Sequence, residues 1–322
     1  MSLANGRPYL AIPGPSTMPD RVLRAMHQGA PNIYEGPLVE MVESLWPDLR
    51  AVAGTTQNVA MYIANGHGVW EAANANLFSR GDKALVLATG RFGLSWAESA
   101  RAMGVEVEVL DFGKSSPVDP DRAAAALRAD PAGKIKAVLT TQVDTASTVR
   151  TDVAGLRAVM DAVGHPALLA VDCIASLGCD AFHMDSWGVD VMVAASQKGL
   201  MVPPGLGFVW FSEKARAACR GSDLKTPYWD WTPRADASPD EAELIAHCKQ
   251  LIGGYKCPRS VTFAPMASAF GLPTRPMPSQ AKKRIQFMMG RPAISSRQVR
   301  MARMGAMGPP GARKPRFRLG SR

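Results

Sequence analysis

Two residues of this 322-residue chain, Lys198 and Asp172, have the types and surroundings that covalent chemistry requires. Asp172 follows the apolar run Ala-Leu-Leu-Ala-Val, and Lys198 follows the mostly apolar run 189–195 and precedes a rigid Pro-Pro-Gly corner. A lysine in a buried site has a lowered pKa and becomes nucleophilic towards aldehydes. A carboxylate buried after an apolar strand needs a cationic partner. Taken singly, the lysine could equally be a solvated loop charge and the acid a loop residue at a strand end.

The elements that would position this pair alternate between strands and helices along the chain. This rhythm predicts an α/β fold with a mostly parallel sheet, in which ligands bind beyond the carboxyl ends of the strands. Short apolar runs predict strands at 59–64, 84–88, 105–110, 137–141, 167–171, 189–195 and 207–211. Helical patterns cover 19–27, 40–52, 94–103, 119–129 and 152–164, and another helix follows Asn65.

Polar or flexible residues follow several of these strands. Asn65 can cap the helix after it, and Gly66 allows close backbone approach, so the free N–H groups there would suit a phosphate. An ordinary capped core helix is the alternative. A lysine, an acid and a phosphate site on such a sheet suit pyridoxal 5′-phosphate (PLP). The lysine would form a Schiff base with its aldehyde, and the acid would keep its ring nitrogen protonated.

Two segments carry a family resemblance: Val-Asp-Cys-Ile-Ala-Ser-Leu-Gly (171–178) and Ser-Gln-Lys-Gly-Leu-Met-Val-Pro-Pro-Gly-Leu-Gly (196–207). They resemble the class V, fold-type-I aminotransferases, and most of all the alanine–glyoxylate and serine–glyoxylate branch. The resemblance covers about residues 8–235. It implies PLP-dependent transamination, with alanine or serine as amino donor and glyoxylate or another small 2-oxo acid as acceptor. It also implies a homodimer, because fold-type-I enzymes build their sites at a dimer interface.

The resemblance also implies roles for individual residues. Lys198 matches the PLP lysine, which would also move the substrate proton, and Asp172 matches the partner of the pyridine nitrogen. Gly14 belongs to the arm that approaches the substrate. The remaining cofactor contacts would be Gly66 and His67 at the phosphate, Gln197 beside the lysine, Phe92 stacked on the ring and Thr145 at the ring face.

Three of these residues have ordinary alternatives, because His67 could point to solvent, Phe92 could be core and Thr145 a loop hydroxyl. The tryptophans are interpreted as core or interface aromatics without a chemical role: Trp70, Trp96, Trp187 and those of the Tyr-Trp-Asp-Trp cluster 228–231.

The charge distribution divides the chain. Residues 1–243 hold 21 Lys and Arg and all 28 Asp and Glu, whereas residues 244–322 hold 16 Lys and Arg and no acid. We therefore expect an N-terminal arm (1–20), a PLP-binding large domain (21–236) and an aberrant, poorly ordered basic tail (237–322) in place of the family's small domain. Arg318 is the tail's candidate for the arginine that binds the substrate carboxylate.

Two interpretations of the tail compete. A basic arm could bind nucleic acid or another polyanion, but its cations form no long run and little aromatic sequence interleaves them, which argues against a nucleic-acid partner. The preferred hypothesis is that the tail is translated in a shifted reading frame. Translating the nucleotide sequence in its other two frames tests this hypothesis. It fails if neither frame yields a helix-rich continuation of mixed charge.

Other features of the sequence narrow the class of protein. The five cysteines form no C-x-x-C pair, which favours reduced thiols in the cytoplasm and argues against a zinc site. No apolar run approaches the roughly 18 residues of a membrane span, and no signal peptide is expected. Two further alternatives stay open: a PLP-binding homologue impaired by loss of its small domain, and a class V cysteine desulfurase using Cys248 or Cys257.

Overall fold

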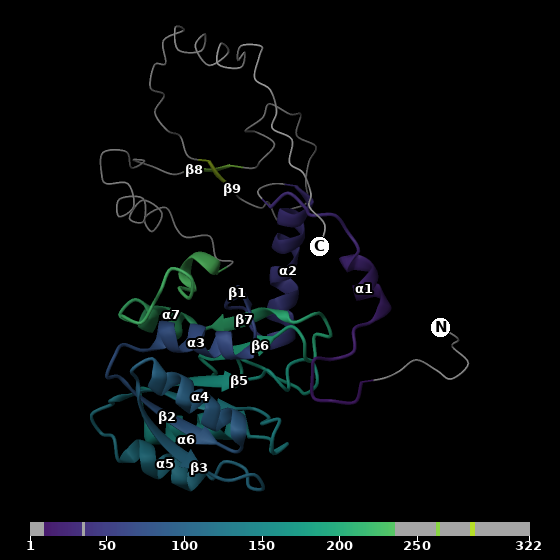
Figure 1. Cartoon of the computed structure of the whole chain (residues 1–322). Coiled ribbons are helices and arrows are strands. Elements are labelled where there is room, and N and C mark those ends of the chain that lie inside the picture. Colours follow the sequence, from purple (N-terminus) through teal and green to yellow (C-terminus); the bar gives the residue numbers. More distant parts are fainter. Residues whose placement is uncertain (1–9, 34–35, 236–261, 265–283, 287–322) are drawn as a thin grey trace, which may run out of the picture. The chain divides into compact units, whose positions relative to one another are not determined.

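The computed structural model describes residues 10–33, 36–235, 262–264 and 284–286 (Figure 1). The chain divides into two units, Met1–Ala237 and Ser238–Arg322. In the second unit, β8 (Thr262–Ala264) pairs antiparallel with β9 (Arg284–Gln286). The rest of the predicted tail 237–322, including Arg318, lies outside the described residues.

The first unit is built on a seven-stranded sheet in the order β1-β7-β6-β5-β4-β2-β3. The strands β6, β5, β4, β2 and β3 run parallel to one another, while β7 pairs antiparallel with both β1 and β6. The strands are β1 (Asn58–Ala64), β2 (Lys83–Ala88), β3 (Glu106–Asp111), β4 (Ile135–Thr141), β5 (Leu168–Asp172), β6 (Val191–Ala195) and β7 (Gly205–Phe211).

Four of the helices, α3, α5, α6 and α7, begin at side-chain caps that the sequence provides. Asn65, Asp119, Asp152 and Ser212 each accept a backbone N–H in the first turn of the helix that follows. The helices are α1 (Asp20–Met26), α2 (Pro37–Ala53), α3 (Gly66–Leu77), α4 (Arg91–Ala102), α5 (Pro120–Arg128), α6 (Val153–Val163), α7 (Glu213–Cys219) and the 3₁₀ turn Thr232–Arg234.

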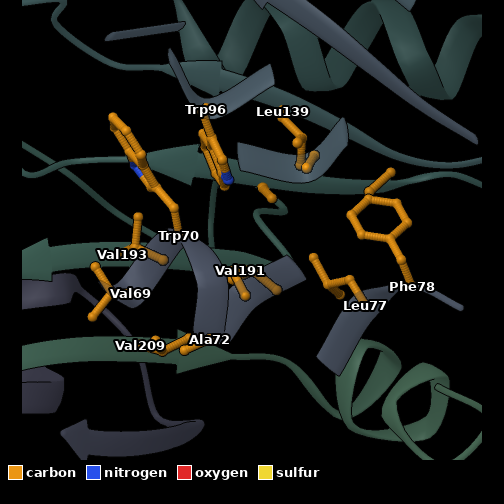
Figure 2. Packing of buried hydrophobic residues seen from close by; sticks show 14 of the residues in the cluster. Val69, Trp70, Ala72, Leu77, Phe78, Trp96, Leu139, Val191, Val193 and Val209 are labelled. Carbon is orange, nitrogen blue, oxygen red and sulfur yellow. The ribbon is translucent and has the colours of Figure 1, made fainter. Parts of the chain in front are cut away.

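Two apolar clusters cover the two faces of the sheet. Alternate residues of β2 divide between them, since Val86 belongs to one cluster and Leu85 to the other. The helices α3, α4 and α7 pack in the first cluster, and α2, α5 and α6 in the second. Figure 2 shows part of the first cluster, in which Trp70 of α3 and Trp96 of α4 lie against each other.

The register of the sheet places the predicted functional residues along one edge. Asp172, the last residue of β5, pairs with Thr141 of β4 and with Val193 of β6. The loop from β6 to β7 carries Lys198 at the same end, because β6 is parallel to β5. The neighbouring strand ends of a parallel sheet therefore bring the acid and the lysine together.

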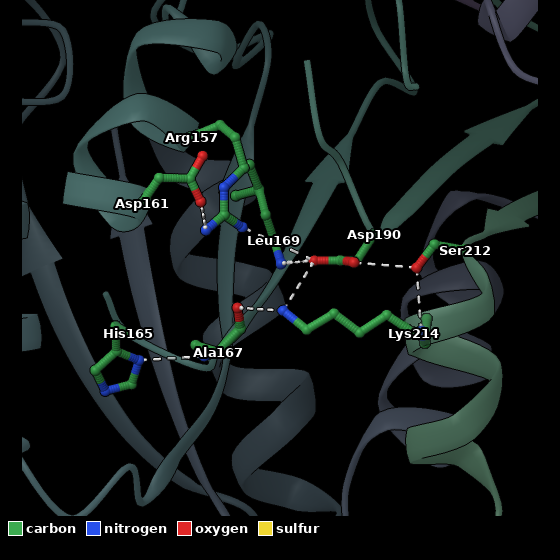
Figure 3. Close-up of polar contacts among 9 residues, drawn as sticks. Arg157, Asp161, His165, Ala167, Leu169, Asp190, Ser212 and Lys214 are labelled. Carbon is green, nitrogen blue, oxygen red and sulfur yellow. Dashed lines mark hydrogen bonds and ion pairs between the residues drawn. The ribbon is translucent and has the colours of Figure 1, made fainter. Parts of the chain in front are cut away.

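A polar cluster closes the opposite edge of the sheet (Figure 3). Asp190 is buried before β6 and accepts hydrogen bonds from the Leu169 N–H (2.9 Å) and the Ser212 hydroxyl (3.0 Å). Arg157 and Lys214 lie 4.0 and 3.9 Å from its carboxylate. The Asp190 carboxylate therefore links β5 to the start of α7. It stabilises the edge of the sheet that lies opposite the predicted site.

The structure confirms the predicted α/β fold with a mostly parallel sheet. It differs from the sequence prediction at the start of α4. The helix predicted over 94–103 already begins at Arg91, because Asp144 binds the N–H groups of Phe92 and Gly93 in its first turn. The last strand, β7, is antiparallel to its neighbours. In the described part of the chain, no helix has both the length and the apolarity that crossing a membrane requires.

Candidate active site

A cavity of about 240 Å³ lies at the carboxyl-end edge of the sheet. The seven residues predicted to contact a cofactor all line it, although they come from five separate segments of the chain. Its lining consists of Asn65, Gly66, His67, Trp70, Phe92, Val143, Thr145, Asp172, Ile174, Ala175, Gln197 and Lys198.

Asp172 is the buried charge of this cavity, with 4% of its surface exposed. Its Oδ1 accepts the Ile174 N–H at 2.7 Å, and its Oδ2 accepts the Trp70 indole N–H at 2.8 Å. Burial raises the pKa of Asp172 to about 7, while these two hydrogen bonds and the charge of Lys198 oppose the rise. The carboxylate is therefore oriented by two donors and still lacks the full stabilisation that an ion in this setting needs.

Lys198 is half-buried in the loop between β6 and β7, not fully buried as the sequence suggested. Its ammonium donates to the Pro13 carbonyl at 3.0 Å. The arm around Pro13 is fastened to the same loop, since Ser16 donates its N–H to the Gln197 carbonyl (2.7 Å) and its hydroxyl to the Lys198 carbonyl (2.8 Å). The N-terminal arm therefore forms part of the lysine's surroundings.

Gly14 lies directly against the lysine side chain. A Cβ at this position would meet Lys198 Cδ at 2.6 Å and Nζ at 2.8 Å, and the φ of Gly14 is +136°. Both the close approach and the backbone conformation require glycine. The structure thus places Gly14 beside the lysine; a contact with substrate stays a prediction.

The start of α3 forms another wall of the cavity. The Asn65 side chain accepts the Gly68 N–H at 3.1 Å and so fixes the first turn. The first N–H groups of a helix have no acceptor within the helix, which leaves those of Gly66 and His67 available to an anion. A Cβ at position 66 would lie 2.8 Å from Ile174 Cδ1, so a side chain there would displace the end of the Ile174 side chain from the cavity wall. The exposed His67 ring packs edge-on against Trp70, 4.8 Å between centroids.

Phe92 lines the cavity because hydrogen bonds from the first turn of α4 to Asp144 fix the position of that turn. One carboxylate oxygen of Asp144 accepts both the Phe92 N–H (2.8 Å) and the Gly93 N–H (3.0 Å). Asp144 lies in the polar loop after β4, next to Thr145, which also lines the cavity. Gly90 lets this carboxylate approach, since a Cβ there would lie 2.5 Å from the carboxyl carbon.

Trp70 and Asp144 are the residues at this site that the sequence interpretation missed. Trp70 was interpreted as a core aromatic without a chemical role, yet its indole N–H binds Asp172. Asp144 sat unmarked in a polar loop. Its position just after a predicted strand, beside the candidate Thr145, was the one signal that could have drawn attention to it.

The model of the family "Aminotransferase class-V" matches residues 48–227, more than half of the chain. The chain therefore belongs to the class-V aminotransferases, as the sequence motifs predicted.

Named relatives agree with this assignment. The chain is 37% identical over 240 residues to a serine–glyoxylate aminotransferase of Methylorubrum extorquens, covering 73% of this chain and 60% of that protein. It is 36% identical to an L-aspartate–glyoxylate aminotransferase of Paracoccus denitrificans, over 68% of this chain and 56% of that protein. The chain thus spans about 60% or less of the length of these relatives.

Solved structures share the fold of the first unit. An aspartate aminotransferase of Thermus thermophilus superposes with a TM-score of 0.63 at 26% identity, over 69% of this chain and 61% of that one. A pyridoxamine–pyruvate aminotransferase of Mesorhizobium loti gives 0.65 at 24% identity, over 72% and 59%.

Class-V aminotransferases use PLP, which is therefore the cofactor of this family member. The residues present fit it. The buried Oε1 of Gln197 has no hydrogen-bond partner although it belongs to a residue that lines the cavity. Asp172 offers a carboxylate that an added cation would stabilise, Lys198 an amine, and the start of α3 an anion site. These are the groups that a phosphorylated pyridine aldehyde requires.

We predict that Asp172→Asn makes the stability of the unloaded chain less dependent on pH. The pKa of Asp172 is about 7 in the folded chain, against the ordinary value of 3.8 for an aspartate side chain. This raised pKa stabilises the fold below about pH 4, and the contribution is lost as pH rises to about 7. Above that pH the ionised acid costs the folded state up to roughly 4 kcal/mol.

Urea unfolding of the cofactor-free chain at pH 5, 6, 7 and 8 measures this effect. The stability of Asp172→Asn relative to wild type should rise with pH across this range and level off above pH 7. Asp111→Asn, at the exposed end of β3, controls for the loss of one charge. A difference that is constant over the range would contradict a raised pKa at Asp172.

Proposed function

We propose that this chain carries out PLP-dependent transamination with glyoxylate as amino acceptor and serine or alanine as donor. The observation that carries the proposal is the cavity itself. It combines an amine (Lys198), a buried carboxylate (Asp172) and a helix N-terminus (Gly66) at one sheet edge. No single one of them would specify this cofactor chemistry, but together they match its aldehyde, ring nitrogen and phosphate.

When bound, the cofactor supplies an aldehyde that bonds an amine and a ring that withdraws electrons from the substrate. With PLP bound, Lys198 would hold it through its amine and would also move the proton at the substrate's α-carbon. The Pro13 carbonyl, 3.0 Å from Nζ, orients the free amine. Asp172 keeps the ring nitrogen protonated, and the N–H groups of Gly66 and His67 bind the phosphate.

The proposed acceptor rests on the names of the relatives. Proteins named serine–glyoxylate, L-aspartate–glyoxylate and alanine–glyoxylate aminotransferases all match this chain, so glyoxylate is the shared part and the donor varies. Three of the matching relatives are named serine–glyoxylate aminotransferases. Serine is therefore the first donor to test, followed by alanine and aspartate.

We predict that Lys198→Ala abolishes the visible absorbance that PLP acquires when bonded to a lysine, and lowers turnover of serine with glyoxylate by at least roughly a thousand-fold. Absorbance spectra and a coupled assay with serine, alanine or aspartate measure the two effects. Lys214→Ala, on the opposite sheet edge, is the matched control and should keep both. Visible absorbance retained by Lys198→Ala would contradict the assignment of this lysine.

The same spectra separate an active enzyme from a homologue that binds the cofactor without turnover. Visible absorbance with no transfer from any of the three donors would support the impaired homologue, whose small domain is lost to a shifted reading frame. Sulfide release from cysteine would support the desulfurase alternative, which the named relatives do not favour. Cys248 and Cys257 lie outside the described residues.

We further propose that the chain acts as a homodimer in the cytoplasm. The N-terminal segment supports the dimer because it exposes large apolar side chains, among them Leu10, Ile12, Leu23 and Met26. The seven-residue helix α1 has no buried residue at all, and an isolated helix of that length is unstable without packing. The free thiols of Cys173, Cys179 and Cys219 are consistent with a reducing compartment.

We predict that the double substitution Leu23→Glu and Met26→Glu shifts the chain from dimer to monomer, because it places two charges in the apolar contact. Sedimentation velocity at micromolar concentration measures the change. Ile63→Glu adds a charge at an apolar residue that is 79% exposed at the end of β1, and serves as control. The proposal fails if the wild-type chain sediments as a monomer, or if the control dissociates as readily as the double variant.

A further inference from the structure

Trp70 contacts the cavity through a single polar atom. Its indole N–H donates to Asp172 Oδ2 at 2.8 Å, while the Ile174 N–H donates to Oδ1 at 2.7 Å. Each oxygen of the Asp172 carboxylate therefore accepts one hydrogen bond from the protein. Because each oxygen can accept a second hydrogen bond, the carboxylate keeps accepting capacity for a ligand in the cavity that Trp70 and Asp172 both line.

The indole ring is itself fixed by aromatic neighbours. It stacks on Trp96 with 6.1 Å between centroids and 11° between planes (Figure 2). It also meets Phe92 edge-on, with 6.3 Å between centroids. Both tryptophans are fully buried, with 1% and 0% exposed. The N–H of Trp96 points to a different acceptor, the Asn74 amide oxygen at 3.1 Å. The two stacked rings thus differ in which side chain their donor reaches.

A hydrogen bond from the indole stabilises the ionised form of Asp172 more than the protonated form. Burial drives this pKa upward, and the Trp70 and Ile174 bonds are the two hydrogen bonds that lower it. Among the charged groups acting on the carboxyl, Lys198 lowers its pKa and Asp144 raises it. The nearby His67 packs on the indole, not on the carboxylate.

We infer that Trp70 is a positioning residue that holds Asp172 ionised and aimed at the ring nitrogen of PLP. The inference rests on the proposed use of this cofactor. One proton is shared between the carboxyl group and the ring nitrogen. By stabilising the carboxylate, the indole N–H keeps that proton on the nitrogen, and the ring then withdraws electrons more strongly.

The test compares Trp70→Phe with Trp96→Phe, its stacked partner, and measures binding of two ligands by spectral titration. One ligand is PLP; the other is the analogue in which carbon replaces the ring nitrogen. At pH 6, where Asp172 of the unloaded chain is largely protonated, Trp70→Phe should weaken PLP binding roughly ten-fold, since the bond to an ionised group is lost. Binding of the carbon analogue, which needs no carboxylate, should change less than about two-fold.

The pH profile gives a second readout that a purely structural role would not move. Without the indole N–H, Asp172 of the unloaded chain should lose its proton at higher pH, so the break in PLP affinity moves upward from about pH 7. The ten-fold deficit should shrink towards pH 9, where the unloaded carboxyl is ionised as well. Trp96→Phe should shift neither the break nor the ratio of the two ligands.

Equal loss of both ligands in Trp70→Phe, no loss of either, or the same ligand-specific loss in Trp96→Phe would overturn the inference. If Trp70→Phe does not fold, benzothienylalanine at position 70 replaces the N–H with sulfur and keeps the ring's shape. A wild-type chain that binds PLP without transferring an amino group contradicts the proposed reaction alone and leaves this comparison valid. A wild-type chain that does not bind PLP overturns both.

Discussion

The burial of one carboxyl group, that of Asp172, is the constraint around which this site is arranged. Taking an ionised carboxylate out of water costs several kcal/mol unless hydrogen bonds and an opposite charge replace the solvent. Here two N–H donors supply the hydrogen bonds, and the pKa still lies near 7. Lys198 gives its ammonium hydrogen bond to Pro13 instead. A cationic ring nitrogen beside this carboxylate would add the stabilisation that two donors and the more distant Lys198 do not complete, which is the role proposed for Asp172 towards PLP.

The position of this pair could be predicted from the sequence because it depends on local patterns. Asp172 and Lys198 each follow an apolar strand, and parallel neighbouring strands end at the same edge. The apolar pattern of residues 207–211 predicts a buried strand, but it does not predict whether β7 runs parallel or antiparallel to its neighbours. The nine residues between β6 and β7 do decide it, because a parallel crossover needs a dozen or more.

Trp70 and Asp144, the two site residues that the sequence interpretation missed, show which contacts cannot be predicted from sequence patterns. Trp70 and Trp96 look alike in the sequence, and both are buried in a stacked pair. Only the tertiary structure reveals that the Trp70 indole N–H reaches a carboxylate at the end of β5, and the Trp96 indole N–H an amide in the core. Asp144 binds the Phe92 N–H, 52 positions earlier in the chain. Both roles arise from tertiary contacts. The position of Asp144 after a strand could mark it as a candidate, but nothing in the sequence indicates that Phe92 N–H is its partner.

The described part of the chain accounts for the cofactor better than for the substrate. Its cavity is lined by Lys198 and His67 but, among the described residues, by no arginine that could bind a carboxylate bidentately. For the proposed transamination, an arginine that binds the substrate carboxylate would have to come from another part of the chain or from a second copy. The N-terminal arm bears on both the site and a second copy. It exposes Leu10 and Ile12, and it also places Gly14 against the Lys198 side chain. A second copy that covered Leu10 and Ile12 would hold the arm in place and, with it, the surroundings of Lys198. Formation of a dimer would then affect the chemistry of the site.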